Sequence, residues 1–247
     1  MHSVTTRRLT AVFVAGAASL AVLAPAASAG EAGPHQGTQT AASQTAASQT
    51  AAAKLPAKLT VKSYTAYLKA QRTPEAKRTL KSFSALPAAK KTAFVGYLQN
   101  GKIYASLFRQ LKGNLNRPVK TVTPYNKDVK FVHEVSSSKN TKGAVAVSYT
   151  ATETIYGIPV TSEKLTLHYK IVKGKVQRGA RAVAKVTNVN AAVAIKGGGV
   201  KVAVKGIARA DVTWKATPKV QAVGKPVLKD QAVTGHLNTW TASLIHG

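Results

Sequence analysis

The chain has 247 residues, of which 36 are Lys or Arg and only 8 are Asp or Glu, giving a formal net charge of +28 at neutral pH. It contains no cysteine, which excludes disulfide bonds and thiolate metal sites. Because so large a surplus of one charge destabilises a compact state, the composition predicts an anionic partner. We expect no catalytic residue set, no cofactor and no bound metal.

The first 29 residues have the three regions of a signal peptide. Arg7 and Arg8 supply a positive start, an apolar stretch follows over 9–23, and Ala27-Ser28-Ala29 forms a small-residue cleavage site. The apolar stretch is shorter than the roughly 20 residues that a membrane span needs, so we predict no membrane span. The chain is therefore expected to be secreted, with association to the cell wall as a further option. The general secretory route is favoured over the twin-arginine route that the Arg pair also suggests.

Residues 30–57 are predicted to form a flexible arm. The arm is rich in Ala, Ser, Gln and Thr, and the pentapeptide AASQT occurs twice in tandem, over 41–45 and 46–50. A segment with almost no bulky apolar side chain cannot bury enough surface to offset the entropy lost on ordering. Both a plain linker and a segment that orders on a partner fit this composition.

Residues 58–117 are predicted to be a helical segment. Its strongest start signal is the run Thr-Pro-Glu at 73–75, which combines a capping hydroxyl, a proline at the first helical position and an acid in the first turn. A second helix is expected from Pro87 to Leu98. A last helix is expected to extend to Gly113, because Ile103, Leu107 and Leu111 recur at helical spacing.

Residues 118–247 are predicted to be an antiparallel β domain, because the apolar period changes from about 3.6 to 2. The clearest alternation buries Leu165, Leu167, Tyr169 and Ile171 and leaves the intervening residues in water. The spacing of the turns favours about eight strands in a sheet or sandwich. The expected fold class is therefore α+β, with N-terminal short helices followed by this sheet.

The sequence between Glu163 and Asp211 contains many basic residues and no acidic one. On strands, side chains of equal parity share a face, so these residues could form one cationic surface or simply a solvated outer face. The predicted partner of the protein is another secreted protein, bound through residues 30–57 and the basic face, or an anionic envelope polymer. Nucleic acid is disfavoured as a partner because the chain is expected to be exported. The candidate anion-binding or partner-binding residues are Lys170, Lys173, Lys175, Arg178, Arg181, Lys185, Lys201, Lys205 and Arg209.

Residues able to support catalysis are few. Two of the six strand-region carboxylates could in principle act as a glycosidase pair, but carboxylates in so basic a chain more often serve ion pairs. These six residues are Asp128, Glu134, Glu153, Glu163, Asp211 and Asp230. His133 has inward parity and is expected to be a hydrogen-bonded core residue. Trp214 and Trp240 are expected in the core, with stacking on sugar rings as the alternative.

Two stretches carry a resemblance to known proteins. The phrases over 73–75 and 86–90, and the strand phrase over 149–160, resemble uncharacterised secreted proteins of Streptomyces-like actinomycetes. This resemblance supports export and implies no activity. The sequence thus favours a non-catalytic binding or adaptor protein, a structural component of an extracellular assembly such as a secreted toxin particle or envelope coat. The alternative is an envelope-associated hydrolase or sugar-binding protein that is retained at the anionic wall by its charge.

Overall fold

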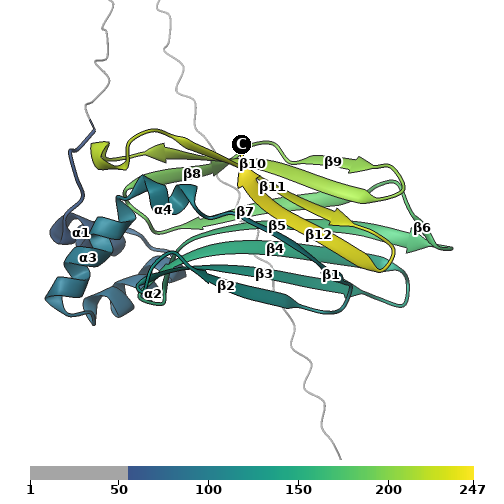
Figure 1. The fold of residues 1–247 in the computed structure, drawn as a ribbon, viewed down its shortest axis with the longest axis horizontal. Helices are drawn as coiled ribbons and strands as arrows, with labels where there is room; N and C mark the ends of the chain where they lie inside the picture. Colours follow the sequence, from purple (N-terminus) through teal and green to yellow (C-terminus); the bar gives the residue numbers. More distant parts are fainter. Residues whose placement is uncertain (1–54) are drawn as a thin grey trace, which may run out of the picture. The chain divides into compact units, whose positions relative to one another are not determined.

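The computed structural model describes residues 55–247. The predicted signal peptide, and the predicted arm up to residue 54, lie outside the described residues. The described part is an α+β fold dominated by antiparallel strands, as the sequence predicts (Figure 1). It contains twelve strands rather than about eight. The additional strands include β6 (Lys175–Val176) and β9 (Lys201–Val204), which are too short to show an alternating pattern.

Four helices precede the sheets: α1 (Val61–Ala70), α2 (Pro74–Ser84), α3 (Ala88–Leu98) and α4 (Gly101–Ala105). The predicted start of α2 is confirmed, because the Thr73 side chain accepts a hydrogen bond from the backbone N–H of Ala76 at 3.2 Å. Helix α3 also begins and ends where the sequence predicts. The two signals that succeed are local, since caps and proline act on the adjacent backbone alone.

The predicted last helix is wrong beyond Ala105. Residues Arg109–Asn114 form strand β1, which pairs antiparallel with β12 (Thr239–His246). Glycine is a poor helix former, and at Gly113 the strand passes so close to Trp240 that an added Cβ would lie 2.5 Å from the ring. Pairing and packing against distant residues therefore override the helical spacing of this stretch.

The first sheet, sheet A, has the strand order β1-β12-β11-β10-β8, and β9 also pairs with β10. All of its pairings are antiparallel. Its remaining strands are β8 (Val193–Gly197), β10 (Ala208–Pro218) and β11 (Val227–Gly235).

The second sheet, sheet B, has the strand order β2-β3-β4-β5-β6, and β7 also pairs with β5. The predicted alternation is confirmed, because the four apolar residues at odd positions over 165–171 are buried while Lys164 and Lys170 are exposed. Its strands are β2 (Val119–Pro124), β3 (Val129–Lys139), β4 (Ala144–Ile155), β5 (Ile158–Val172) and β7 (Arg181–Asn188), together with β6.

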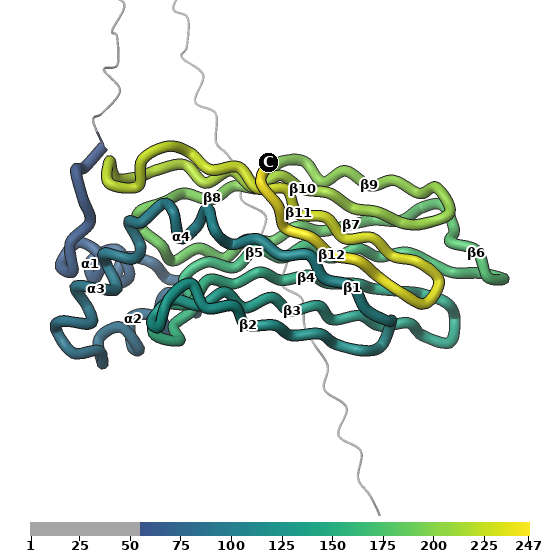
Figure 2. The backbone as a smooth tube through the Cα atoms, in the orientation of Figure 1, coloured from purple at the N-terminus to yellow at the C-terminus, as the bar shows by residue number. Residues whose placement is uncertain are grey.

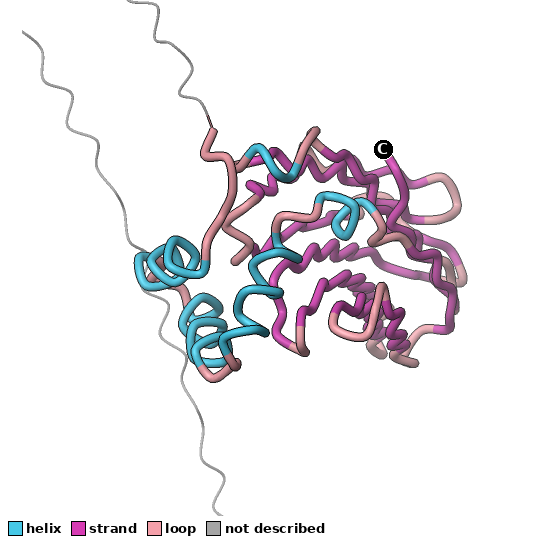
Figure 3. The backbone as a smooth tube through the Cα atoms, turned by 60° about the vertical axis from the view of Figure 1, so that its left-hand side comes forward, coloured by secondary structure: helices cyan, strands magenta, loops and turns pink. Residues whose placement is uncertain are grey.

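The helices and both sheets share one apolar core, a point that the sequence leaves open. Helices α1 to α3 gather at one end of the two sheets (Figures 1 and 3). Buried Tyr64 of α1 donates from its hydroxyl to the carbonyl of Val189 at 3.1 Å, and Asn190 donates from its side chain to the carbonyl of Leu98 at 3.0 Å. The loop after β7 is thereby fastened to the helical end.

The last residues of the predicted arm are hydrogen-bonded to the folded part of the protein. Backbone N–H groups of the short 3-10 helix Gln221–Val223 donate to the carbonyls of Pro56 at 2.9 Å and Ala57 at 3.1 Å. Among residues 55–247, no helix is long and apolar enough to cross a bilayer.

Candidate functional site

All nine basic residues singled out by the sequence are exposed: Lys170, Lys173, Lys175, Arg178, Arg181, Lys185, Lys201, Lys205 and Arg209. Sheet register divides them into three groups. The division matters because only cations on adjoining surfaces can bind one extended anion together.

The first group lies on the outer face of sheet B. Lys170 is near the end of β5, and the neighbouring strand β7 presents Arg181 and Lys185 on the same face. The register places Arg181 opposite His168 and Lys185 opposite Lys164. Lys164, which the list of candidates omits, therefore belongs to this surface.

The second group, Lys173, Lys175 and Arg178, surrounds the β5–β6 turn and the segment that follows it. Lys173 occupies the left-handed backbone region with φ of 49°, next to Gly174. This turn lies at the end of the sheets away from the helices (Figure 1). These cations are therefore displaced along the long axis of the molecule from Lys185.

The third group belongs to sheet A. Lys201 is the first residue of β9, Lys205 follows the strand directly, and Arg209 lies on β10. The Arg209 Nε donates to both carboxylate oxygens of Asp211, at 3.0 and 2.9 Å, and Lys201 is the strand partner of Asp211. Asp211 therefore offsets part of the positive charge of this group, which makes it a weaker anion site than the first.

Sheet register reveals a lysine row that the sequence does not. Lys164 on β5 stands directly opposite Lys185 on β7, and Lys196 on β8 stands directly opposite Lys215 on β10. All four are exposed. Strand β7 lies next to β8 at the edge where the two sheets meet (Figure 2). We call Lys164, Lys185, Lys196 and Lys215 the lysine row.

The β7–β8 connection places the two halves of the lysine row at one level. The Asn188 side chain donates to the carbonyl of Val193 at 2.8 Å, which holds the two strands together at their turn. Lys185 and Lys196 are each three residues from this contact, on the two strands that the connection joins. The row therefore consists of two directly opposed lysine pairs, one on β5 and β7 of sheet B and one on β8 and β10 of sheet A.

The lysine row is electrostatically unfavourable without a counterion. Like charges directly opposite each other on a sheet are destabilising. In the described part, the ion pairs are Arg78–Glu75, Lys120–Glu134, Arg209–Asp211 and Lys229–Glu163, and none of them includes a member of the row. A bound polyanion would offset this repulsion at both opposed lysine pairs.

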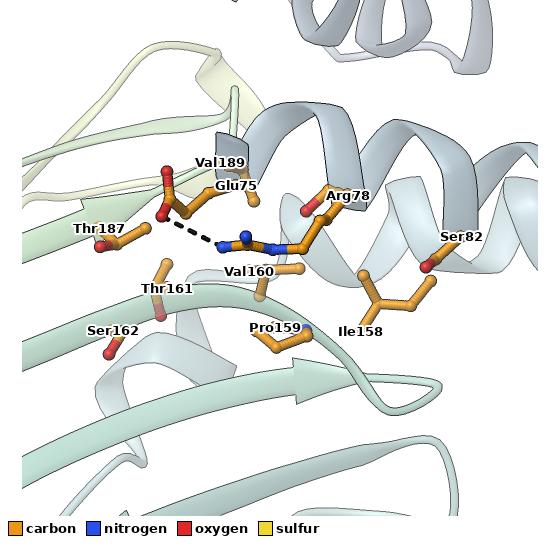
Figure 4. Close-up of a pocket in the computed structure, with 11 residues that line it drawn as sticks. Glu75, Arg78, Ser82, Ile158, Pro159, Val160, Thr161, Ser162, Thr187 and Val189 are labelled. Atoms are coloured by element: carbon orange, nitrogen blue, oxygen red, sulfur yellow. Dashed lines mark hydrogen bonds and ion pairs between the residues drawn. The ribbon is translucent and has the colours of Figure 1, made fainter. Parts of the chain in front are cut away.

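A pocket of about 280 Å³ lies between α2 and the β5–β7 pair (Figure 4). Its floor is apolar, with Ile158 and Val160 among its lining residues. The Arg78 guanidinium extends over it and pairs with Glu75 at 3.2 Å. These two charges form an ion pair beside the pocket, and the hydroxyl groups of Ser82, Ser162 and Thr187 also line it.

A buried charged cluster joins the two sheets. Lys229 of β11 and Glu163 of β5 form an ion pair, with Nζ 2.8 Å from Oε2 and both side chains 0 % exposed. The Tyr104 hydroxyl of α4 donates to the other carboxylate oxygen, Oε1, and its ring centroid lies 3.4 Å from the Lys229 Nζ. The expectation that acids serve ion pairs is confirmed for Glu163. Burial lowers the pKa of Lys229, whereas the charge of Glu163 opposes that change.

Glu153 is a second buried carboxyl beside this pair. It projects inward from β4, on the strand next to that of Glu163, and the Thr161 hydroxyl donates to its Oε2 at 3.4 Å. Burial raises its pKa to about 7, against the opposing influence of the Lys229 charge. Thr161 also lines the pocket of Figure 4, so a pocket-lining residue contacts Glu153.

The other polar core residues connect strands within and between the sheets. His133 is buried as predicted, and its Nδ1 lies 2.9 Å from the Tyr149 hydroxyl, while its Nε2 finds no hydrogen-bond partner among residues 55–247. Burial lowers its pKa to about 4, and the charges of Arg109 and Lys229 act in the same direction. The Trp214 indole donates to the Gln231 carbonyl oxygen at 2.8 Å, linking β10 to β11.

The alternative of sugar stacking on tryptophan is wrong for this chain. Trp214 is 1 % exposed and Trp240 is 0 % exposed, so neither ring can reach a ligand at the surface. Among residues 55–247, no group of three or more His, Asp or Glu side chains is arranged to hold a metal ion. No family model, curated protein or solved structure matches the chain.

Proposed function

We propose that this protein is a secreted, basic, non-catalytic binding protein, an adaptor in an extracellular assembly, and that its lysine row engages an extended anionic partner. The observation that carries the proposal is the register, which sets Lys164 against Lys185 and Lys196 against Lys215 with no acidic residue in ion-pair range of any of them in the described part.

The row is suited to a linear polymer or an acidic protein strand. Each half of the row sets two lysines directly opposite each other on paired strands, which lie about 4.8 Å apart. Lys170 and Arg181 lie beside its β5–β7 half and extend the positive surface. Lysine ammonium groups bind phosphate and carboxylate as point charges and require no fixed orientation of the anion. This arrangement supports charge-driven binding with little discrimination among polyanions.

Salt dependence tests the proposal directly. The wild-type chain and a variant with all four row lysines replaced by Gln are titrated with linear polyphosphate at several salt concentrations. Each neutralised phosphate contributes about 0.7 to the slope of log K against log salt on a single strand. We expect the variant to lose roughly three from that slope.

A matched variant separates the row from the overall charge. Replacing the exposed lysines Lys58, Lys62, Lys69 and Lys81 at the helical end by Gln removes the same charge elsewhere. We expect this control to keep nearly the wild-type slope. Equal losses in both variants would mean that binding follows net charge alone, and the proposed site would be abandoned.

Capture from culture supernatant shows whether the natural partner is an acidic protein or an envelope polymer. A stoichiometric protein that stays bound at high salt supports the adaptor role. Release from isolated cell walls by salt alone supports retention on an envelope polymer.

A further inference from the structure

The buried cluster contains an amine and a carboxyl group in direct contact, away from bulk solvent. Lys229 Nζ lies 2.8 Å from Glu163 Oε2, and neither side chain is exposed. We propose that Lys229 and Glu163 condense spontaneously to an amide, so that a covalent bond joins β11 of sheet A to β5 of sheet B.

Three features of the cluster favour condensation over a plain ion pair. Contact within a rigid core corresponds to an effective concentration on the order of 10⁵–10⁸ M. The interior excludes the water that would otherwise reverse the reaction, and an amide is cheaper to bury than two separate charges. Burial also lowers the pKa of Lys229, which favours the neutral amine that attacks a carbonyl carbon.

The groups around the pair match the needs of the reaction. The Tyr104 hydroxyl donates to Glu163 Oε1, the oxygen on which negative charge develops when the carbon becomes tetrahedral. Burial, followed by the charge of Glu163, holds the pKa of Tyr104 well above its ordinary value, so the hydroxyl keeps its proton. Trp214, the strand partner of Lys229, and the Tyr104 ring leave the amine in apolar surroundings.

A second buried carboxyl group lies near the pair. The register sets Ala151 opposite Glu163 and Glu153 opposite Thr161, so Glu153 and Glu163 are diagonal neighbours on the inner face of sheet B. Glu153 accepts a hydrogen bond from the Thr161 hydroxyl, whereas Lys229 pairs with Glu163. Glu163 Oε2 is therefore the atom in position to take a proton from the Lys229 ammonium.

The step balances without any further reactant. Glu163 Oε2, which lies 2.8 Å from Nζ, accepts one proton from the Lys229 ammonium, and the Nζ lone pair then bonds to Cδ of Glu163. A second proton moves from Nζ to Oε2. The bond from Cδ to Oε2 breaks, one water molecule leaves, and the amide keeps the third proton of the ammonium group on its nitrogen.

Mass spectrometry of the purified, fully denatured chain tests the proposal. We expect its mass to be lower than that of the sequence, counted from its determined N-terminus, by one water molecule. Trypsin should then release a branched peptide that joins residues 143–164 to residues 220–247, because acylated Lys229 is no longer a cleavage site and the Lys225–Pro226 bond resists trypsin. Fragment ions should place the branch at Glu163.

Two variants and one control sharpen the result. Lys229→Arg keeps the charge but should show no loss of water, whereas the control Lys215→Arg, at an exposed position, should show the full loss. Tyr104→Phe should slow formation in refolded protein on the order of 100-fold, because the donor to Glu163 Oε1 is gone. A folded Tyr104→Phe chain that condenses at the wild-type rate would remove Tyr104 from the mechanism.

The wild-type chain alone decides the main claim, even where a variant fails to fold. Recovery of the unbranched peptide 220–229 and the full calculated mass from folded protein overturns the proposal. A branch located at Glu153 would overturn the assignment of Glu163.

Discussion

Replacing Glu153 with Gln should make the stability of this protein rise with pH between about 4.5 and about 7, a range over which the stability of the wild-type chain changes little. Burial raises the pKa of Glu153 from its ordinary 4.5 to about 7. The folded chain therefore holds a proton that the unfolded chain releases between these values, and stability falls as the pH rises through that window. At about 1.4 kcal/mol for each tenfold change in acidity, the full effect is about 3 kcal/mol.

His133 acts in the opposite direction. Burial lowers its pKa from 6.5 to about 4, so the unfolded chain binds the proton first and stability falls as the pH drops from about 6.5 to about 4. In the wild-type chain the two windows overlap and the two effects largely cancel. Glu153→Gln removes the first effect and leaves the second.

Urea denaturation followed by tryptophan fluorescence at a series of pH values measures this difference, because Trp214 and Trp240 are both buried. Between pH 4.5 and 7, the free energy of unfolding of the variant should rise by about 3 kcal/mol relative to that of the wild-type chain. Changes in overall charge repulsion affect both chains alike and cancel in the comparison. Glu134→Gln, at an exposed carboxylate, is the control and should leave the pH profile unchanged. Parallel profiles for wild type and Glu153→Gln would refute the reasoning.

Two further predictions concern single contacts. Gly113→Ala should destabilise the chain by about 1–3 kcal/mol, because its Cβ would lie 2.5 Å from the Trp240 ring; Gly199→Ala, with open space around it, should change the midpoint of urea denaturation little. Thr73→Ala should cost about 1 kcal/mol through loss of the cap of α2, measured in the same assay, whereas Thr92→Ala in α3 should not destabilise; equal effects at the two threonines would contradict the capping argument.

The parts of the fold that the sequence predicts are those with local causes. The α2 start depends on Thr73 and Pro74, and the inner face of β5 depends on strict alternation over 165–171. The β1 strand has no such local signal. Its conformation is determined by pairing with β12, more than a hundred residues later in the chain, and by the fit of Gly113 against Trp240. Long-range pairing of this kind decides between helix and strand where propensity is weak.

The candidate site likewise has features that the sequence predicts and features that depend on long-range pairing. That the basic residues of 164–210 are exposed follows from composition and parity. Which of them face one another depends on strand register, and the register brings in Lys196 and Lys215, which parity alone does not connect. The contact between Lys229 and Glu163 was equally invisible in the sequence, because the two residues are 66 positions apart and belong to different sheets.

That separation gives the proposed amide a structural value. In the chain-entropy description, a cross-link that closes a loop of 66 residues stabilises the folded state by about 4 kcal/mol, because it restricts the unfolded chain. A chain without cysteine cannot obtain such a restriction from disulfides. The amide would supply it between the two sheets, and unlike a disulfide it would persist under reducing conditions. A strongly cationic surface disfavours the compact state, so a covalent link in the core and a lysine row at the surface are compatible features of one molecule: the first maintains the fold against the repulsion that the second creates.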